Sequence, residues 1–221
     1  KRFMNQHIYH ILHNRIVFLE YAPGQILKEQ VLAEEFGVSR TPLRTVLFRL
    51  EWEHLVRILP RTGIQVSELE LNTITHLFQA RLELESVIGT MAADRFSKPH
   101  FTRLDECMEQ CRQLLDHRDP EALGRVDMNL KQIFHDAAGN PFLTEMSDRF
   151  YVLTFRLWYF NLMKMDNLSW KQEVFCLLAD VKALMDVLAK GPPEGVGKTR
   201  KTQLLAHVER IRTTFLGLSG I

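Results

Sequence analysis

The stretch LAEEFGVSRTPLR, residues 32–44, decides how the first third of this chain folds. Gly37 interrupts a run with apolar residues at helical spacing, and Ser39 follows it at a position suited to a helix N-cap. A proline then falls in the first turn of the next helix, where its missing N–H costs nothing. The stretch therefore predicts a short helix over 29–36, a turn, and a second helix over 40–53.

The predicted helix over 40–53 has one apolar face and one basic, polar face. The apolar face recurs at helical spacing and comprises Leu43, Val46, Leu47 and Leu50. The opposite face carries Arg40, Thr41, Arg44 and Thr45. Because Arg40 and Arg44 are one turn apart, they point the same way. Such a face fits the major groove of DNA, where arginine commonly makes bidentate contacts with guanine.

The segments around these two helices complete a recognisable layout. Residues 3–20 have apolar side chains at helical spacing and predict a first helix. After the helix over 40–53, the short runs LVRILP and GIQVS flank RTG, residues 61–63, and predict a β-hairpin. Helix, helix, turn, helix and hairpin together form a winged helix-turn-helix.

From Asn72 onward the pattern predicts only helices, which makes the fold mainly α. Proline, glycine and asparagine signals separate the expected segments at 73–95, 100–117, 120–138, 141–165, 169–190 and 199–217. The run KGPPEGVGK, residues 190–198, is expected to be a loop, and it lacks the spacing of a phosphate-binding loop. We expect a DNA-binding domain over residues 1–70 and a helical bundle, for ligand binding and dimerisation, over 71–221.

Composition and charge agree with a soluble DNA-binding protein. Hydrophobic residues make up 46% of the chain and charged residues 25%. Residues 1–66 hold 9 Lys and Arg against 6 Asp and Glu, whereas the remainder is slightly acidic. Three scattered cysteines fit a reducing cytoplasm, and no membrane-spanning or signal-peptide pattern is present. The basic first third is therefore the better candidate for an anionic partner.

Residues 23–69 strongly resemble the N-terminal domain of the GntR superfamily of bacterial transcription regulators. The resemblance rests on PG followed by LAEEFGVSRTPLR, a leucine-rich helix, and a wing containing P-x-x-G. The sequence departs from the family at Gln30, Thr45 and His54, where an arginine, a glutamate and a glycine are usual. The resemblance implies DNA contacts by Ser39, Arg40, Thr41, Arg44, Thr62 and Gly63.

The helical remainder resembles the FadR-like branch of that superfamily, whose effector domain is called FCD. LFQARLELESVIGTMAADR at 77–95 looks like its first helix, and IFHDAAGNPFL at 133–143 looks like its histidine-containing signature. HVERI, which starts at His207, looks like its last ligand-binding helix. The two resemblances together cover nearly the whole chain.

Many members of this branch hold a divalent metal with one aspartate and three histidines. Here Lys131 stands where the aspartate is expected, four residues before His135, and Val181 stands in place of one histidine. A charged lysine repels a cation. His135 and His207 remain as possible ligands of a divalent transition metal, and the four-ligand site is expected to be incomplete.

Two readings of the remaining polar residues stay open. Lys131, His135, His207 and Arg81 would together suit a carboxylate or phosphate group in a partly dry cavity. Alternatively, Lys131 is exposed to solvent and the two histidines are satisfied core residues. In the first reading the effector is a small anionic metabolite such as an organic acid.

The sequence as a whole predicts a cytoplasmic transcription regulator, most often a repressor in this family, and not an enzyme. A homodimer would bind an inverted repeat in double-stranded DNA and respond to a small molecule. One alternative is a regulator that still binds a metal at a reduced site. Another is a constitutive DNA-binding protein. A helical enzyme would need a complete acid/base or metal set, which the sequence lacks.

Overall fold

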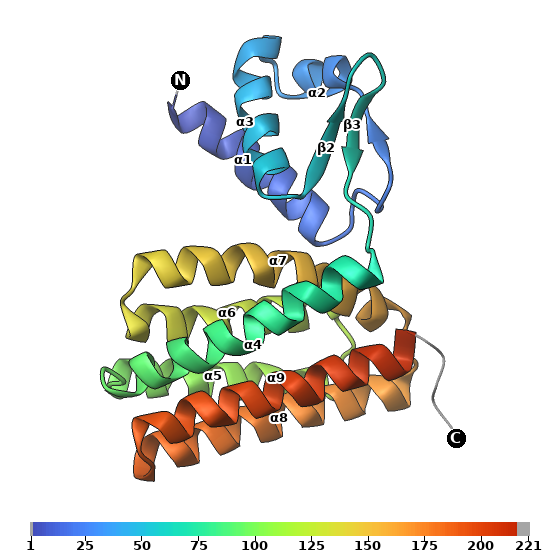
Figure 1. Ribbon diagram of the computed structural model, residues 1–221. Coiled ribbons are helices and arrows are strands. Elements are labelled where there is room, and N and C mark those ends of the chain that lie inside the picture. Colours follow the sequence, from blue (N-terminus) through green and yellow to red (C-terminus); the bar gives the residue numbers. More distant parts are fainter. Residues whose placement is uncertain (1, 216–221) are drawn as a thin grey trace. The chain divides into compact units, whose positions relative to one another are not determined.

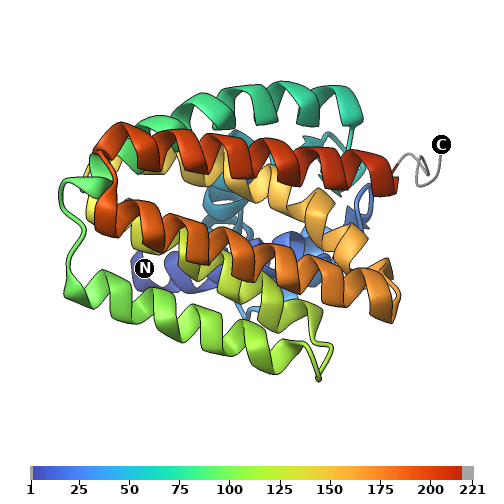
Figure 2. The ribbon, with the colours of Figure 1, turned by 90° about the horizontal axis from the view of Figure 1, so that it is seen from below.

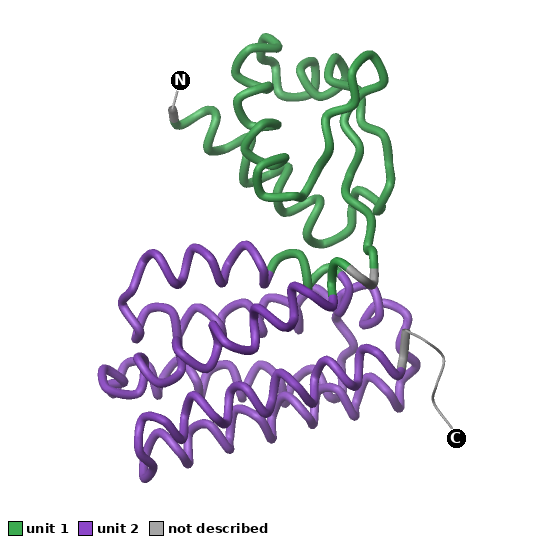
Figure 3. Tube along the Cα trace, in the orientation of Figure 1, with its two compact units in different colours: residues 1–74, 152–156 green, residues 75–151, 157–221 purple. Residues whose placement is uncertain are grey.

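The computed structural model describes residues 2–215 and leaves out Lys1 and residues 216–221. The chain divides into two compact units (Figure 3). Unit 1 comprises residues 1–74 and 152–156, and unit 2 comprises residues 75–151 and 157–221. The first division lies near residue 74, and five residues of a later helix, 152–156, cluster with unit 1.

In its described residues, unit 1 contains three complete helices and a small sheet, and the helices and the hairpin follow the order that the sequence predicted (Figure 1). The elements are α1 (Arg2–Val17), β1 (Ile26–Leu27), α2 (Glu29–Glu35), α3 (Arg40–Trp52), β2 (Val56–Leu59) and β3 (Gly63–Val66). The first helix ends three residues before the predicted position. Strand β1 was not predicted, because two residues are too short for an alternating pattern to show.

The sheet is antiparallel and has the order β1-β3-β2. Strands β2 and β3 form the predicted hairpin, with Leu59 opposite Gly63. Gly63 has φ +140°, and a Cβ atom there would lie 2.5 Å from the Leu27 carbonyl oxygen. Glycine is therefore required at this position so that β3 can approach β1.

The core of unit 1 buries the apolar face of α3. Leu43, Val46, Leu47 and Leu50 are all buried, as their spacing predicted. They pack in one cluster with apolar residues of α1, including Ile8 and Leu12, and with Val56 and Ile64 of the hairpin. This packing fixes the helix and turns its Arg40 and Arg44 face toward solvent.

The remaining helices build unit 2, an all-helical bundle (Figures 1 and 2). Helix α5 contacts α6 and α8, and α8 contacts α9. The helices are α4 (Leu71–Ala93), α5 (Lys98–Leu114), α6 (Pro120–Ala138), α7 (Pro141–Lys164), α8 (Asn167–Lys190) and α9 (Pro193–Phe215). The mainly α fold class is thereby confirmed. No helix in the described part of the chain is long and apolar enough to cross a membrane.

The largest error of the sequence prediction concerns the start of the last helix. A loop was expected over 190–198, but α9 begins at Pro193 and runs through Gly195 and Gly197. Proline suits the first helical position, whereas two glycines in a helix each cost about 1 kcal/mol relative to alanine. The predicted end at residue 217 lies outside the described residues.

The two helical glycines of α4 and α9 allow a close approach between these helices. A Cβ atom on Gly197 would lie 2.3 Å from the Thr90 Oγ1 atom and 2.4 Å from the Ser86 carbonyl oxygen. A Cβ atom on Gly89 would lie 3.1 Å from the Cα atom of Gly197. Since the side chains at a crossing set the distance between helix axes, these glycines bring α9 against α4.

Candidate functional site

A groove of about 680 Å³ lies on unit 1 between α2, α3 and the hairpin. Four residues predicted to contact DNA line this groove, namely Arg40, Arg44, Thr62 and Gly63. Ser39 and Thr41, the two other predicted contacts, are exposed at the start of α3. Helix packing and the hairpin thus bring residues more than twenty positions apart in sequence to one surface.

Arg44 already has a partner within this groove. Its Nε atom donates to Oε1 of Glu29 over 2.8 Å, and its Nη2 atom donates to Oε2 over 3.2 Å. The Arg44 side chain is nevertheless 59% exposed. The pair fixes the direction of the guanidinium while leaving it accessible from solvent.

Two predicted contacts differ in detail from the expectation. Ser39 occupies the N-cap position of α3, but its side chain accepts no capping hydrogen bond from any described residue. Its exposed hydroxyl therefore does not serve the helix. Gly63 was predicted to contact DNA, and the structure also gives it a role inside the sheet, where it lies close to Leu27.

Sequence reasoning missed two basic residues of the groove. Lys28 donates from Nζ to the carbonyl oxygen of Thr62 over 2.8 Å, which ties the chain before α2 to the hairpin tip. Arg61 lies at that tip with φ +64°, a conformation that is uncommon for a residue other than glycine. The signal for Arg61 was its place in RTG, between the two strands.

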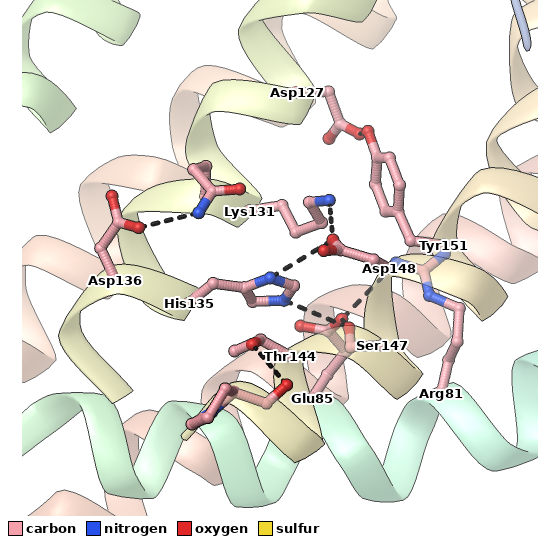
Figure 4. A network of polar contacts seen from close by, with 12 residues as sticks. Arg81, Glu85, Asp127, Lys131, His135, Asp136, Thr144, Ser147, Asp148 and Tyr151 are labelled. Atoms are coloured by element: carbon pink, nitrogen blue, oxygen red, sulfur yellow. Dashed lines mark hydrogen bonds and ion pairs between the residues drawn. The ribbon is translucent and has the colours of Figure 1, made fainter. Parts of the chain in front are cut away.

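A second polar site lies in unit 2, where α6 ends and α7 begins. Gly139 ends α6 in the left-handed conformation, with φ +60°. Asn140 then caps α7, because its side chain accepts a hydrogen bond from the Leu143 N–H. This tight turn folds α7 back beside α6, so that Ser147 and Asp148 lie over His135 (Figure 4).

His135 and Lys131 converge on the same carboxylate (Figure 4). Lys131 forms an ion pair with Oδ1 of Asp148, and His135 Nδ1 lies 3.4 Å from that oxygen. This Nδ1 atom is buried and makes no hydrogen bond with any described residue. Burial raises the pKa of Asp148, but His135 and Lys131 outweigh burial and lower it.

The other ring nitrogen of His135 leads to a buried ion cluster. His135 Nε2 lies 3.2 Å from the Ser147 hydroxyl, which donates to Glu85 Oε1 over 2.8 Å. Arg200 forms an ion pair with Glu85 Oε2, and Arg81 lies 3.9 Å from Oε1. Burial raises the pKa of Glu85, but Arg200, Arg81 and Ser147 together lower it to about 2.

We call this group the His135 cluster. Its members are Arg81, Glu85, Lys131, His135, Ser147, Asp148 and Arg200. Tyr151 adjoins it, with its ring 4.5 Å from Lys131 Nζ and its hydroxyl donating to Asp127 over 2.5 Å. Three of the four residues predicted to bind an effector are therefore in one network.

The fourth predicted residue, His207, lies in a different group. Its Nδ1 atom is 3.6 Å from Glu173, a buried carboxylate that also binds Arg210 over 3.1 Å and the Trp158 indole over 2.9 Å. Arg200, and not His207, is the α9 side chain that enters the His135 cluster. Arg200 and His207 are seven positions apart on α9, which is about 10 Å along the helix axis.

The residues around His135 do not fit a divalent metal. Asp148 is the nearest acidic ligand, and the Lys131 ammonium already pairs with it. A positive charge at that point opposes a cation. Within residues 2–215, no group of three or more His, Cys, Asp or Glu side chains is arranged to hold a metal ion.

Two different family models match the N-terminal part and the helical remainder of the chain. Residues 4–66 match the gntR family of bacterial regulatory proteins, and residues 76–209 match the FCD domain. The transcriptional repressor RspR of Escherichia coli is 27% identical over 135 residues, which are 61% of this chain and 59% of RspR. The regulator McbR of the same organism is 26% identical over 130 residues, 59% of each chain. The matches thus span about three fifths of these relatives.

Solved structures show the same fold. The structure titled E. coli McbR/YncC has a TM-score of 0.83 at 18% identity, covering 96% of this chain and 98% of that one. A GntR regulator from Rhodococcus sp. RHA1, described as putative, has a TM-score of 0.74 at 19% identity, covering 94% and 96%. At these identities the two likenesses show the shared fold. The chain belongs to the gntR family of bacterial regulatory proteins and carries an FCD domain.

Proposed function

We propose that the chain is a transcription regulator that binds specific double-stranded DNA through α3 and the β2–β3 hairpin. The observation that supports this most is the single groove shared by Arg40, Arg44 and the hairpin tip. Four basic side chains line it against two acidic ones, and these six are Lys28, Arg40, Arg44, Arg61, Glu29 and Glu34. An excess of positive charge on a concave surface favours a polyanion.

The exposed residues of this groove and of the start of α3 would make two kinds of contact. Arg44 and Arg40 would reach base edges in the major groove, where arginine binds guanine O6 and N7. Ser39 and Thr41, with the N–H groups at the start of α3, would bind phosphates. Thr62 and Gly63, joined by Arg61, would lie along the neighbouring backbone or minor groove.

We further propose that the chain acts as a homodimer on an inverted repeat and represses transcription. Two copies related by twofold symmetry present two recognition helices to two half-sites. RspR and GlaR of Escherichia coli, which resemble this chain, are both named as transcriptional repressors. These names support repression here.

The effector that we propose is a small organic anion bound at the His135 cluster. Asp148 is 45% exposed, whereas Lys131 is 13% exposed and His135 is 1% exposed in their side chains. An incoming carboxylate would replace Asp148 as the acceptor for the Lys131 ammonium and would accept a hydrogen bond from His135 Nδ1. Charge-assisted hydrogen bonds in a partly dry site favour this exchange.

The charge around the site supports an anion of low charge. Arg81, Lys131 and Arg200 carry three positive charges, and Glu85 and Asp148 carry two negative charges. Asp127, bound by the adjoining Tyr151 hydroxyl, lies at the edge of the same region. Glu85 already occupies Arg200 and Arg81, so the exchange would centre on Lys131 and His135.

A melting-temperature screen with acetate, succinate, citrate and inorganic phosphate tests the effector site. At least one anion is expected to raise the melting temperature and to change DNA affinity, and Lys131→Gln is expected to remove both effects. Lys201→Gln is the matched control, because it removes an ammonium that pairs with Glu83 on the surface of the same unit. If every anion acts equally on both variants, the proposal that an anion binds at the His135 cluster is wrong. If a broad panel of organic acids has no effect, a constitutive DNA-binding protein is the better account.

A further inference from the structure

Phe48 is an exposed aromatic side chain that lines the charged groove on unit 1. It is 59% exposed and lies on α3, one turn after Arg44. It lines the same groove as Arg40, Arg44 and the hairpin residue Arg61. The i, i+4 spacing places the Phe48 and Arg44 side chains next to each other on one helix face.

The buried core of unit 1 does not include this phenyl ring. The buried face of α3 is already complete without it, with Leu43, Val46, Leu47 and Leu50. Most exposed positions on this side of α3 are polar, so an exposed ring here lacks a structural reason. An apolar group on a recognition surface is instead expected to become buried when the partner binds.

The chemistry of the groove indicates what covers the ring. Its basic side chains outnumber its acidic ones, which favours a nucleic acid over an apolar protein segment. The major groove of DNA offers one apolar feature to a protein, the C5-methyl group of thymine, and phenylalanine is among the side chains that contact it. The ring and the methyl group are matched in polarity, whereas the other base edges there present mainly hydrogen-bond donors and acceptors.

We infer that Phe48 is a specificity-determining residue that reads the C5-methyl group of a thymine beside the base contacted by Arg44. One helical turn advances about 5.4 Å, and base pairs follow each other every 3.4 Å or so. The thymine therefore lies within two base pairs of the Arg44 contact. This inference rests on the proposed DNA-binding function and adds a base to its recognition sequence.

Selection from a random pool of duplexes, followed by uracil scanning, tests the inference. The tightest duplex for the full chain is remade with each thymine replaced in turn by deoxyuridine, which removes only the methyl group. One replacement per half-site is expected to lower the affinity of the unchanged chain about fourfold, the value for one buried methylene-sized group. Phe48→Ala is expected to bind the thymine and uracil duplexes equally, and Phe48→Leu to retain part of the difference.

Trp52→Ala is the matched control, because Trp52 is also 59% exposed on α3 but is not among the groove-lining side chains. It should keep the full sensitivity to uracil. If all thymines tolerate uracil, or if Phe48→Ala keeps the same sensitive position, the inference is overturned while DNA binding stands. If no duplex is enriched at all, the proposed function fails and the inference fails with it.

Discussion

Arg200 of α9 and Glu85 of α4 form a buried ion pair one turn away from the point where Gly197 and Gly89 let the two helices touch. The ion pair depends on the close approach of the two helices. Without the two glycines at the crossing, α9 would lie further from α4, and the Arg200 guanidinium would not reach Glu85. Through Ser147, the same carboxylate is linked to His135.

Gly197→Ala is predicted to destabilise unit 2. The new methyl group would meet the Thr90 hydroxyl and the Ser86 backbone within 2.4 Å, so the helices must separate. Overpacking of this kind costs roughly 1–3 kcal/mol, which over most of that range exceeds the gain of about 1 kcal/mol from replacing glycine in a helix. Chemical denaturation would show a lower free energy of unfolding. Gly195→Ala is the control, since its methyl group meets a movable Val187 methyl at 3.3 Å. If both variants were equally stable, the result would contradict the close approach of α4 and α9 at Gly197.

The ion pair at Glu85 predicts how stability depends on pH. The pKa of Glu85 is about 2 in the folded chain, against an ordinary value of 4.5. A carboxylate with a lowered pKa stabilises the fold fully above pH 4.5, and this contribution is lost as the pH falls from 4.5 toward 2. Glu85→Gln should therefore destabilise the chain at pH 7, by roughly 3–5 kcal/mol for a buried pair that loses one partner.

Melting curves of Glu85→Gln and the unchanged chain between pH 7 and pH 2 measure this dependence. The difference in stability should shrink as the pH approaches 2. Glu83→Gln serves as the control, because Glu83 is 72% exposed where it pairs with Lys201. A constant difference from pH 7 to pH 2 would show that the charge of Glu85 does not stabilise the fold.

Arg44→Ala is predicted to lower specific DNA affinity by roughly 1–3 kcal/mol and to relax the base preference at one position. Arg44 is the exposed arginine that Glu29 holds in a fixed direction, and its guanidinium suits a bidentate base contact. Fluorescence anisotropy on a set of single-base duplex variants measures both effects. Arg57→Ala, which removes an exposed arginine of β2, should leave the preference unchanged. An equal loss on all sequences would argue against base readout by Arg44.

Glu29→Gln is predicted to raise affinity for random DNA and to lower the ratio of specific to random binding. The substitution removes a negative charge from the groove and weakens the bidentate hold on Arg44. Nonspecific DNA binding is electrostatic, so its affinity is expected to increase when the negative charge of Glu29 is removed. Base reading depends on a guanidinium held in a fixed direction, so the specific contribution to DNA affinity is expected to decrease. Salt titrations on specific and random duplexes would show this, and a higher ratio in the variant would refute the positioning role of Glu29.

Much of unit 1 could be predicted because its signals are local. The spacing of Leu43, Val46, Leu47 and Leu50 indicated the buried face of α3, and RTG indicated the hairpin turn. Strand β1 could not be predicted, since its two residues pair only through long-range contact with β3. The hydrogen bond from Lys28 to the Thr62 carbonyl oxygen at the hairpin tip likewise could not be predicted, because it forms only in the tertiary fold.

The polar site of unit 2 could be predicted only in part. His135, Lys131 and Arg81 were expected together, and they lie in one cluster. Arg200 was missed because α9 was expected to start after the glycine-rich run, and the packing that favours Gly197 in a helix involves residues a hundred positions earlier. His207 was expected at this site, but it is two turns further along α9, beside Glu173.

The central claim, sequence-specific DNA binding through α3 and the hairpin, is tested most directly by one affinity ratio. The full chain is titrated at physiological salt with its tightest selected duplex and with a shuffled duplex of the same composition. We predict a ratio of at least about 10³, the lower range for specific regulators, and a collapse of that ratio when Arg40 and Arg44 are both replaced by alanine. Equal affinity for the selected and shuffled duplexes would contradict the account.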